Sequence, residues 1–207
     1  MAHNRIKTEG RITIDGMLQR TVKTTVRCQG VGLHTGATVT MTISPAEPNT
    51  GIVFLRTDLS GPAAAIQARW DNVVDTRLCT VVGNAQGTTV GTVEHLMSAL
   101  AGCGVDNALV ALDNIEVPIM DGSAAPFVEA IERVGTVTQN APRRVIRILK
   151  PVTVKDGGKS ATFTPDEVTT YSFEIDFDNA VIAHQSHEVE LDGESFKDEI
   201  SRARTFG

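Results

Sequence analysis

Ala37-Thr38-Val39-Thr40-Met41-Thr42-Ile43-Ser44 is the stretch of sequence that decides the fold. From position 38 onward, threonine alternates strictly with an apolar side chain. Because successive side chains of a strand point to opposite faces, this alternation predicts a β-strand with one buried face. Further strands are predicted where apolar or alternating runs are bounded by Gly, Asn or Asp, at residues 52–55, 78–82, 108–112 and 171–177.

Three helices are predicted among these strands. The first covers residues 92–101, between two glycines. The second begins near Ser123, which we expect to be its N-cap, has Pro126 in its first turn and ends before Gly135. A third begins near Ser195.

The alternating pattern recurs 120 residues along the chain, where Pro165 corresponds to Pro45 and Asp178 to Asp58. In both copies an alternating strand runs into Pro, and a second strand then runs into Asp. We interpret this recurrence as a duplicated module. The second copy has only 29 residues after Asp178, so we expect it to be incomplete at Gly207.

The recurrence divides the chain into four parts. We predict a disordered extension at residues 1–16, a first module at 17–138, a linker at 139–142 and the first part of a second module at 143–207. We expect the unfinished module to leave apolar side chains of residues 171–177 uncovered.

Composition excludes several classes of protein. The net charge is -6 and no run of Lys or Arg occurs, which argues against nucleic-acid binding. No apolar stretch reaches the roughly 18–20 residues that span a bilayer, and no signal peptide is evident. The three cysteines, Cys28, Cys79 and Cys103, are far apart, which favours reduced thiols in the cytoplasm over a disulfide framework.

The first predicted helix carries the candidate chemistry. Glu94 is its only carboxylate and His95 its only imidazole, and both lie on the face opposite Val93, Leu96 and their apolar neighbours. We therefore expect this pair to face a cleft. A neutral imidazole is a good zinc ligand, and an adjacent carboxylate can deprotonate a metal-bound water. The alternative is a partly exposed polar edge without metal, which is the commoner outcome for such a pair.

Three other patterns allow alternative interpretations. His34 lies in a glycine-rich segment, which favours a hairpin turn with an exposed His but also allows close approach to a ligand. His184 and His187 are three apart, so an extended chain places them on opposite faces and a shared metal is not expected. Residues 121–123 precede the second helix and favour capping over anion binding.

Four segments together resemble the UDP-3-O-acyl-N-acetylglucosamine deacetylase (LpxC) family. They occur in the family's order and at near-family spacing, and the resemblance runs from about Met17 to Gly207. The segments are GVGLHTG at residues 30–36, TVEHL at 92–96, PIMDGSAAPF at 118–127 and SRARTFG at 201–207.

The resemblance implies a fold and an activity. The fold is α+β, with two similar modules, each a β-sheet layer packed on a helix layer, which face each other across the active site. The activity is that of a zinc-dependent hydrolase, which removes acetyl from the glucosamine nitrogen of UDP-3-O-acyl-N-acetylglucosamine. This step belongs to lipid A biosynthesis in Gram-negative bacteria, and the full-length protein is expected to be a cytoplasmic monomer.

The resemblance also implies roles for individual residues. Glu94 corresponds to the general base and His95 to a Zn²⁺ ligand. The Thr205 hydroxyl is expected to stabilise the oxyanion that forms when zinc-bound water attacks the amide. Residues expected near the substrate are His34, Leu78, Cys79 and Phe206.

The chain departs from the family pattern in one respect. The family's other two zinc ligands, a His and an Asp, and a further catalytic His have no matching motif within these 207 residues. We therefore expect a fragment that is inactive alone, since one protein ligand does not make a zinc site. The alternative is a non-catalytic binding or interaction module that has kept the scaffold.

Overall fold

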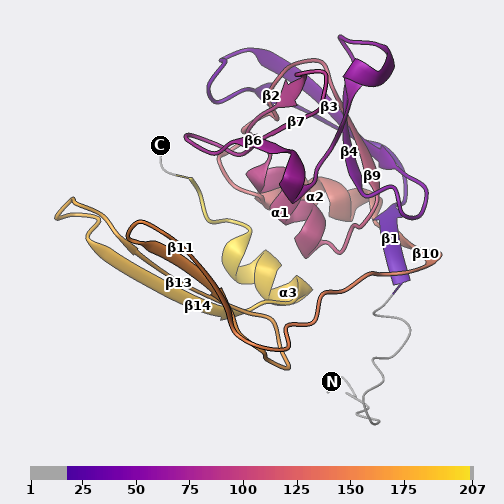
Figure 1. Cartoon of the computed structure of the whole chain (residues 1–207). Helices are drawn as coiled ribbons and strands as arrows, with labels where there is room; N and C mark the ends of the chain where they lie inside the picture. Colours follow the sequence, from indigo (N-terminus) through magenta and orange to yellow (C-terminus); the bar gives the residue numbers. More distant parts are fainter. Residues whose placement is uncertain (1–17, 206–207) are drawn as a thin grey trace.

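The largest sheet of the computed structural model, which describes residues 18–205, is mixed and has five strands (Figure 1). Its strand order is β2-β3-β9-β4-β5; β9 is antiparallel to β3 and parallel to β4. The strands are β2 (Val26–Val31), β3 (Thr38–Pro45), β9 (Ala108–Leu112), β4 (Ile52–Arg56) and β5 (Ala65–Gln67). The predicted extension at residues 1–16, and Phe206, lie outside the described residues.

Two helices, α1 (Glu94–Gly102) and α2 (Ala125–Val134), share one apolar core with this sheet. The predicted alternation in β3 is confirmed, because Val39, Met41 and Ile43 are fully buried while the threonines between them are not. The core is completed by side chains from the other strands and both helices, including Phe54, Val110, Leu112, Leu96, Leu100, Phe127 and Ile131. None of the helices formed by residues 18–205 is both long and apolar enough to cross a membrane.

A three-stranded sheet and two 3₁₀ turns lie between β4 and α1. The sheet consists of β6 (Val73–Asp75), β7 (Val81–Gly83) and β8 (Thr89–Val90), and the turns are η2 (Gly61–Ala64) and η3 (Trp70–Asn72). The strand predicted at residues 78–82 is therefore mostly wrong, since only its last two residues enter β7. Leu78 lies before that strand and is 85% exposed.

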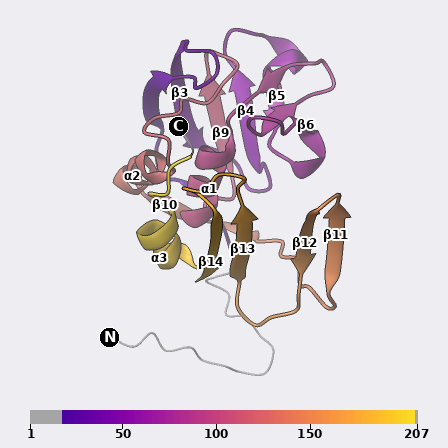
Figure 2. The same cartoon turned by 90° about the vertical axis from the view of Figure 1, so that its left-hand side faces the viewer.

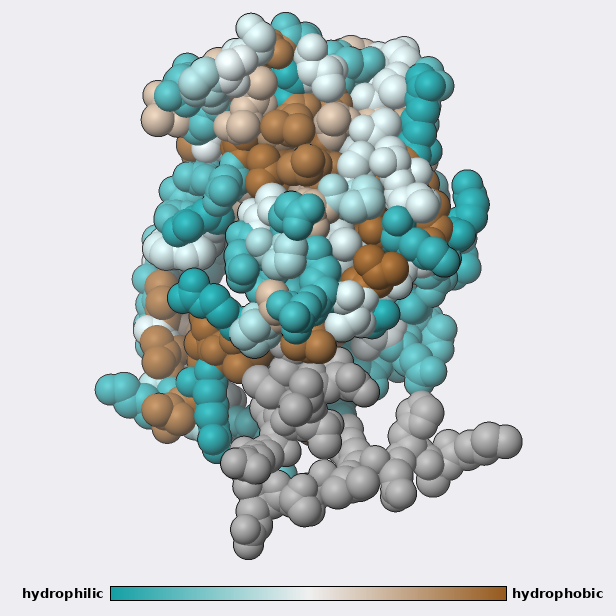
Figure 3. All heavy atoms as spheres, turned by 90° about the vertical axis from the view of Figure 1, so that its right-hand side faces the viewer, coloured by the Kyte–Doolittle hydropathy of each residue, from teal (hydrophilic) through white to brown (hydrophobic). Residues whose placement is uncertain are grey.

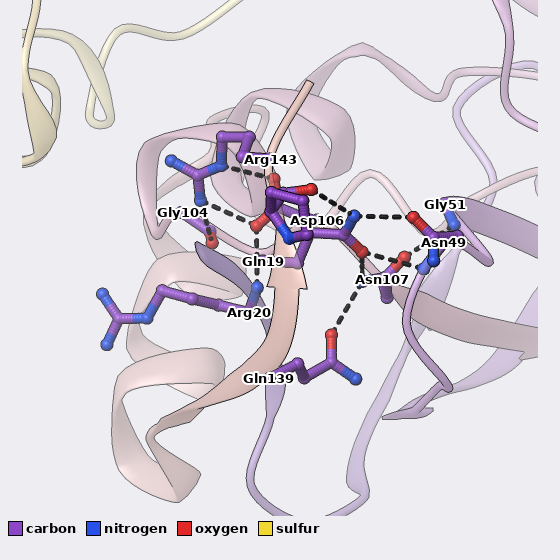
Figure 4. Close-up of polar contacts among 10 residues, drawn as sticks. Gln19, Arg20, Asn49, Gly51, Gly104, Asp106, Asn107, Gln139 and Arg143 are labelled. Carbon is purple, nitrogen blue, oxygen red and sulfur yellow. Dashed lines mark hydrogen bonds and ion pairs between the residues drawn. The ribbon is translucent and has the colours of Figure 1, made fainter. Parts of the chain in front are cut away.

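The predicted linker at residues 139–142 is wrong, because these residues lie within β10 (Thr136–Pro142). β10 pairs antiparallel with β1 (Leu18–Val22). Amide side chains hold this pair against the sheet: the buried Asn107 side chain donates to Gln19 and Gln139 (Figure 4). The segment without regular structure comes later, at residues 143–151.

The beginning of that segment is fixed by an ion pair. The Arg143 guanidinium donates to both carboxylate oxygens of Asp106, at 2.7 Å each, and to the Gly104 carbonyl at 3.1 Å (Figure 4). Asp106 also accepts from the Arg20 amide of β1 at 2.8 Å. The position of Arg143, where the chain leaves β10, is therefore fixed relative to β1 and the five-stranded sheet.

Two antiparallel hairpins follow (Figure 2). One pairs β11 (Val152–Asp156) with β12 (Lys159–Phe163), and the other pairs β13 (Thr170–Asp176) with β14 (His184–Glu190). This order of pairs matches β2–β3 and β4–β5 in the first half of the chain. However, no strand within residues 18–205 joins the two hairpins as β9 joins β3 and β4. The α+β class is thus observed, while the division into two modules stays a prediction.

A helical segment returns from the second hairpin to the first sheet region (Figure 1). It consists of a single turn, α3 (Gly193–Ser195), which continues as a π-helical turn, η4 (Phe196–Ile200). It begins at Gly193, with Asp192 as the N-cap, so the predicted start near Ser195 is two residues late. The Phe196 ring is buried in the core against Gly102, where an added Cβ would lie 2.0 Å from the ring.

Apolar residues also reach the surface, in several separate patches on the face shown in Figure 3. The strands of the two hairpins contribute many of the exposed apolar side chains: Val152, Val154, Phe163, Tyr171, Phe173 and Ile175. The expectation that residues 171–177 leave apolar side chains uncovered is therefore confirmed for Tyr171, Phe173 and Ile175, whereas Phe177 is half-buried.

Candidate active site

Glu94 is the first residue of α1 and follows Thr92, whose backbone conformation is unusual, by two residues. Thr92 has a φ of 56°, in the left-handed region that a β-branched residue rarely adopts. The helix therefore begins at Glu94 rather than at the predicted Thr92. One carboxylate oxygen of Glu94 accepts a hydrogen bond from the Thr80 amide, and the other oxygen is buried without a hydrogen-bond partner.

A cavity of about 380 Å³ lies beside Glu94. Its walls are mainly apolar and come from α1, from β7 and from the segment around η3. The apolar lining residues are Ala68, Trp70, Val73, Val82, Val93 and Met97. Glu94 is one of the residues that line this cavity, whereas His95, which was expected to face the same cleft, is not.

His95 follows Glu94 and is half-buried. The predicted apolar face of this helix is confirmed, with Leu96 and Leu100 in the core. Ala99, which the helical pattern placed on the same face as His95, is instead fully buried. The polar face of α1 is therefore narrower than the helical pattern indicated, because Ala99 belongs to the buried core.

The segment before β7 lies against the start of α1. Besides the bond from Thr80 to Glu94, the Cys79 sulfur lies 3.6 Å from the point that an added Cβ at Gly91 would occupy. Cys79 is half-buried, whereas the Leu78 side chain extends into solvent. The structure thus brings Cys79 close to the Glu94 region.

Sequence reasoning missed the carboxylate that organises this region, Glu116. It is 3% exposed and accepts hydrogen bonds from the amides of His34 and Thr35 and from the hydroxyls of Thr35 and Thr92. Burial alone would raise the pKa of Glu116, but these hydrogen bonds outweigh it, so the pKa lies below its ordinary value. Its sequence signal was a single charge in the otherwise apolar run from Ile115 to Met120.

His34 lies in the connection between β2 and β3, and its side chain is exposed. The structure therefore agrees with the interpretation as a turn with an exposed His. The turn is nevertheless fixed, because its backbone is bound to Glu116 at 3.0 Å from the His34 amide. Through Glu116, the segments around His34 and Thr92 lie next to each other.

The fourth family-like segment reaches the same region from the C-terminal side. The Thr205 amide donates to the Gly122 carbonyl at 2.9 Å, and the Thr205 side chain is exposed. Gly122 in turn donates to Ile119, whose amide donates to Val31 at the end of β2. Direct hydrogen bonds therefore join the segments at 30–36, 118–127 and 201–205, and Glu116 connects the segment at 92–96 to the segment at 30–36.

The turn before α2 is stabilised by its own side chains. Asp121 accepts from both the amide and the hydroxyl of Ser123, and the Ser123 hydroxyl accepts from the Ala125 amide. The N-cap residue is Ala124, so the N-cap prediction for Ser123 is wrong by one position. Burial raises the pKa of Asp121, but the Ser123 hydrogen bonds and the Arg204 charge outweigh it, so that pKa is lowered.

One cluster within residues 18–205 has three ligand groups close enough to hold a metal ion, and it is not at α1. Glu174, Asp176 and His184 place ligand atoms within 4.8 Å of one another on the β13–β14 hairpin. All three are exposed, and such groups are common without an ion. His187 lies on the opposite face, where its ring contacts Phe173, as predicted from the spacing.

Comparison with known proteins identifies the class to which this arrangement belongs. Residues 19–207 match the family model of LpxC, UDP-3-O-acyl N-acetylglycosamine deacetylase, and the chain belongs to this family. Similar curated proteins are the UDP-3-O-acyl-N-acetylglucosamine deacetylases of Pseudoalteromonas atlantica and Pseudomonas entomophila, 51% and 53% identical over 191 residues. That of Myxococcus xanthus is 52% identical over 189 residues.

The three alignments each cover 91% of this chain. They cover 62% of the Pseudoalteromonas and Pseudomonas proteins and 60% of the Myxococcus protein. The chain therefore spans about three fifths of the length of these relatives. A site that the whole relatives build need not be complete in these residues.

Proposed function

We propose that this chain supplies part of the active site of a zinc-dependent deacetylase, which removes acetyl from UDP-3-O-acyl-N-acetylglucosamine in lipid A biosynthesis. The observation that carries the proposal is the Glu94 carboxylate, with one buried oxygen that has no hydrogen-bond partner, next to His95 at the start of α1. Such an orphaned acceptor is costly unless another group binds there. A water or a substrate group would satisfy it.

The residues present fit part of a zinc site. His95 would be one ligand through an imidazole nitrogen, and Glu94 is placed beside it to hold a water. Zinc, when bound, would polarise the acetyl carbonyl and lower the pKa of a water. His95 belongs to no group of three ligand side chains within residues 18–205, so the remaining ligands would come from elsewhere.

In this proposal Glu94 and Thr205 have different tasks. Glu94 takes the proton from the attacking water and can return it to the departing nitrogen of glucosamine. Thr205 donates its hydroxyl to the oxyanion, for which its exposed side chain is free to reorient. Substrate contacts are proposed for His34, Leu78, Cys79 and Phe206.

We also propose that the 207-residue chain is inactive alone, and that the complete protein is a cytoplasmic monomer. Metal analysis tests the first statement: after dialysis, the chain should retain far less than one zinc per molecule. Stoichiometric, tightly bound zinc on this polypeptide would show that the site needs no further ligands. Acetate release by the chain alone would have the same consequence.

The roles of Glu94 and His95 are tested in a protein extended to the length of its relatives. Glu94→Gln should lower kcat by about 10²-fold or more without loss of zinc, since it removes only the base. His95→Ala should lose zinc as well. Glu129→Gln is the matched control, because Glu129 is an exposed carboxylate on α2. Wild-type zinc binding without any deacetylation would favour the alternative of a non-catalytic module.

A further inference from the structure

We propose that Glu116 is a positioning residue, whose buried carboxylate joins the turn that carries His34 to the start of α1 and so fixes where Glu94 and His95 lie. The roles of Glu94 and His95 come from the proposed function. The joining itself does not depend on a metal or a substrate.

Both oxygens of Glu116 are engaged by donors. Oε1 accepts from the His34 amide at 3.0 Å and from the Thr92 hydroxyl at 2.7 Å. Oε2 accepts from the amide and the hydroxyl of Thr35, both at 3.0 Å. Each oxygen faces a backbone N–H, which can only donate, so the position requires an acceptor on both sides, which among side chains of this size only an ionised carboxylate provides.

The backbone around Glu116 contacts the same two segments. The Gly91 amide donates to the Ile115 carbonyl at 2.9 Å, and the Val117 amide donates to the Gly91 carbonyl at 3.0 Å. Two residues further on, the Ile119 amide donates to Val31 at 2.9 Å. Residues 115–119 thus lie between the end of β2 and the residue that precedes Thr92, so the carboxylate is held in place.

Two neighbouring residues fit this arrangement closely. An added Cβ at Gly32 would lie 2.4 Å from Glu116 Oε2, so only glycine allows the carboxylate to approach. Thr92 has its strained φ of 56° while its hydroxyl is bound to Glu116. Such strain persists only where the surroundings impose it. Since Glu94 follows two residues later, the backbone angle of Thr92 sets the direction of the first turn of α1.

Backbone NMR of the 207-residue chain tests the joining directly. In Glu116→Gln the side chain keeps its size, but in either orientation its NH₂ group must face a backbone N–H, that of His34 or that of Thr35. We expect the His34 and Thr35 amides to exchange about tenfold faster or more, since a hydrogen bond to a charged acceptor is lost. We also expect amide chemical shifts to move at residues 92–95.

Asp113→Asn is the matched control. The Asp113 carboxylate accepts from the Thr40 amide of β3 at 2.8 Å. Removing its charge should leave amide exchange at residues 34 and 35 and the amide chemical shifts at residues 92–95 unchanged. If Glu116→Gln leaves exchange at 34 and 35 unchanged, the carboxylate does not hold the turn. If only the turn responds while residues 94 and 95 keep their shifts, positioning of the pair is refuted.

A kinetic measurement in the protein of full family length completes the test. Glu116→Gln should lower kcat at least about tenfold with a much smaller change in KM, because alignment rather than binding is lost. An unchanged kcat would overturn the positioning role. A wild-type protein without deacetylase activity would refute the proposed function alone, because the amide measurements require neither zinc nor substrate.

Discussion

The two halves of the chain form strand pairs in the same order but differ in what covers them. In the first half, β9 joins the two pairs into one sheet, and α1 and α2 share its core. In the second half every residue of β11 and β12 is exposed, and only Val189 is buried in the other hairpin. Alternation therefore specifies strands in both halves, whereas burial depends on elements distant in sequence.

The largest expected effect comes from removing the same side chain in both halves. Phe54 on β4 is fully buried, and Phe54→Ala should destabilise the chain by about 3–5 kcal/mol through lost burial and an unfilled cavity. Phe163 on β12 is 66% exposed, and Phe163→Ala should change stability by less than about 1 kcal/mol. Urea denaturation measures both. Equal losses would show that the hairpins are buried in solution.

The Phe196 ring of the second half packs against Gly102 of the first half, and Gly102→Ala disturbs this contact. The new methyl group would overlap the Phe196 ring, so we expect a loss of about 1–3 kcal/mol from overpacking. In a Phe196→Ala background the same change should cost nothing or stabilise by up to about 1 kcal/mol, because Ala favours helix more than Gly. This double-mutant cycle isolates the contact. Additive effects would show that Phe196 does not dock there.

A smaller effect is expected at the point where the halves are connected. Arg143→Ala removes three hydrogen bonds to Asp106 and Gly104 from a half-buried guanidinium, and we expect a loss of about 1–2 kcal/mol. Arg69→Ala is the control, because Arg69 makes a similar two-bond pair with Asp71 but is exposed. We expect no measurable change there. Thermal unfolding measures both variants. Equal shifts of the Tm would show that the Arg143 ion pair contributes no more to stability than the exposed Arg69 pair.

Local sequence patterns predicted those helices and strands that are specified by signals within a few residues. The strand at 108–112 and the end of the helix before Gly135 match β9 and α2, since alternation, apolar runs and glycine punctuation act within a few residues. The same local reasoning predicts the pair Glu94–His95, from an isolated acid and imidazole on one helix.

Long-range contacts explain what the sequence did not predict. Residues 139–142 resemble a linker in composition, but they form a strand because Gln139 bonds to Asn107 and Pro142 pairs with Leu18. Glu116 acts through donors from residues 34, 35 and 92, about 24 to 82 positions away. No local pattern contains such partners, so only the folded chain reveals them.

The smallest expected effect concerns pH and compares one carboxylate with one histidine. The folded-state pKa of Glu116 lies below its ordinary value, so its contribution to stability is full above the unfolded pKa of about 4.5 and is lost as pH falls through the folded pKa. In the second hairpin, the Asp176 hydrogen bond raises the pKa of His184 above 6.5. The contribution of His184 to stability is therefore present below its unfolded pKa and is lost as pH rises through its folded pKa.

Because His184 is solvent-exposed, we expect His184→Ala to leave the pH dependence of stability unchanged, while Glu116→Gln flattens it below about pH 4.5. Denaturation midpoints measured about once per pH unit between pH 3 and pH 8 test both expectations. If His184→Ala changes the pH dependence of stability and Glu116→Gln does not, the expected difference between the two groups is wrong.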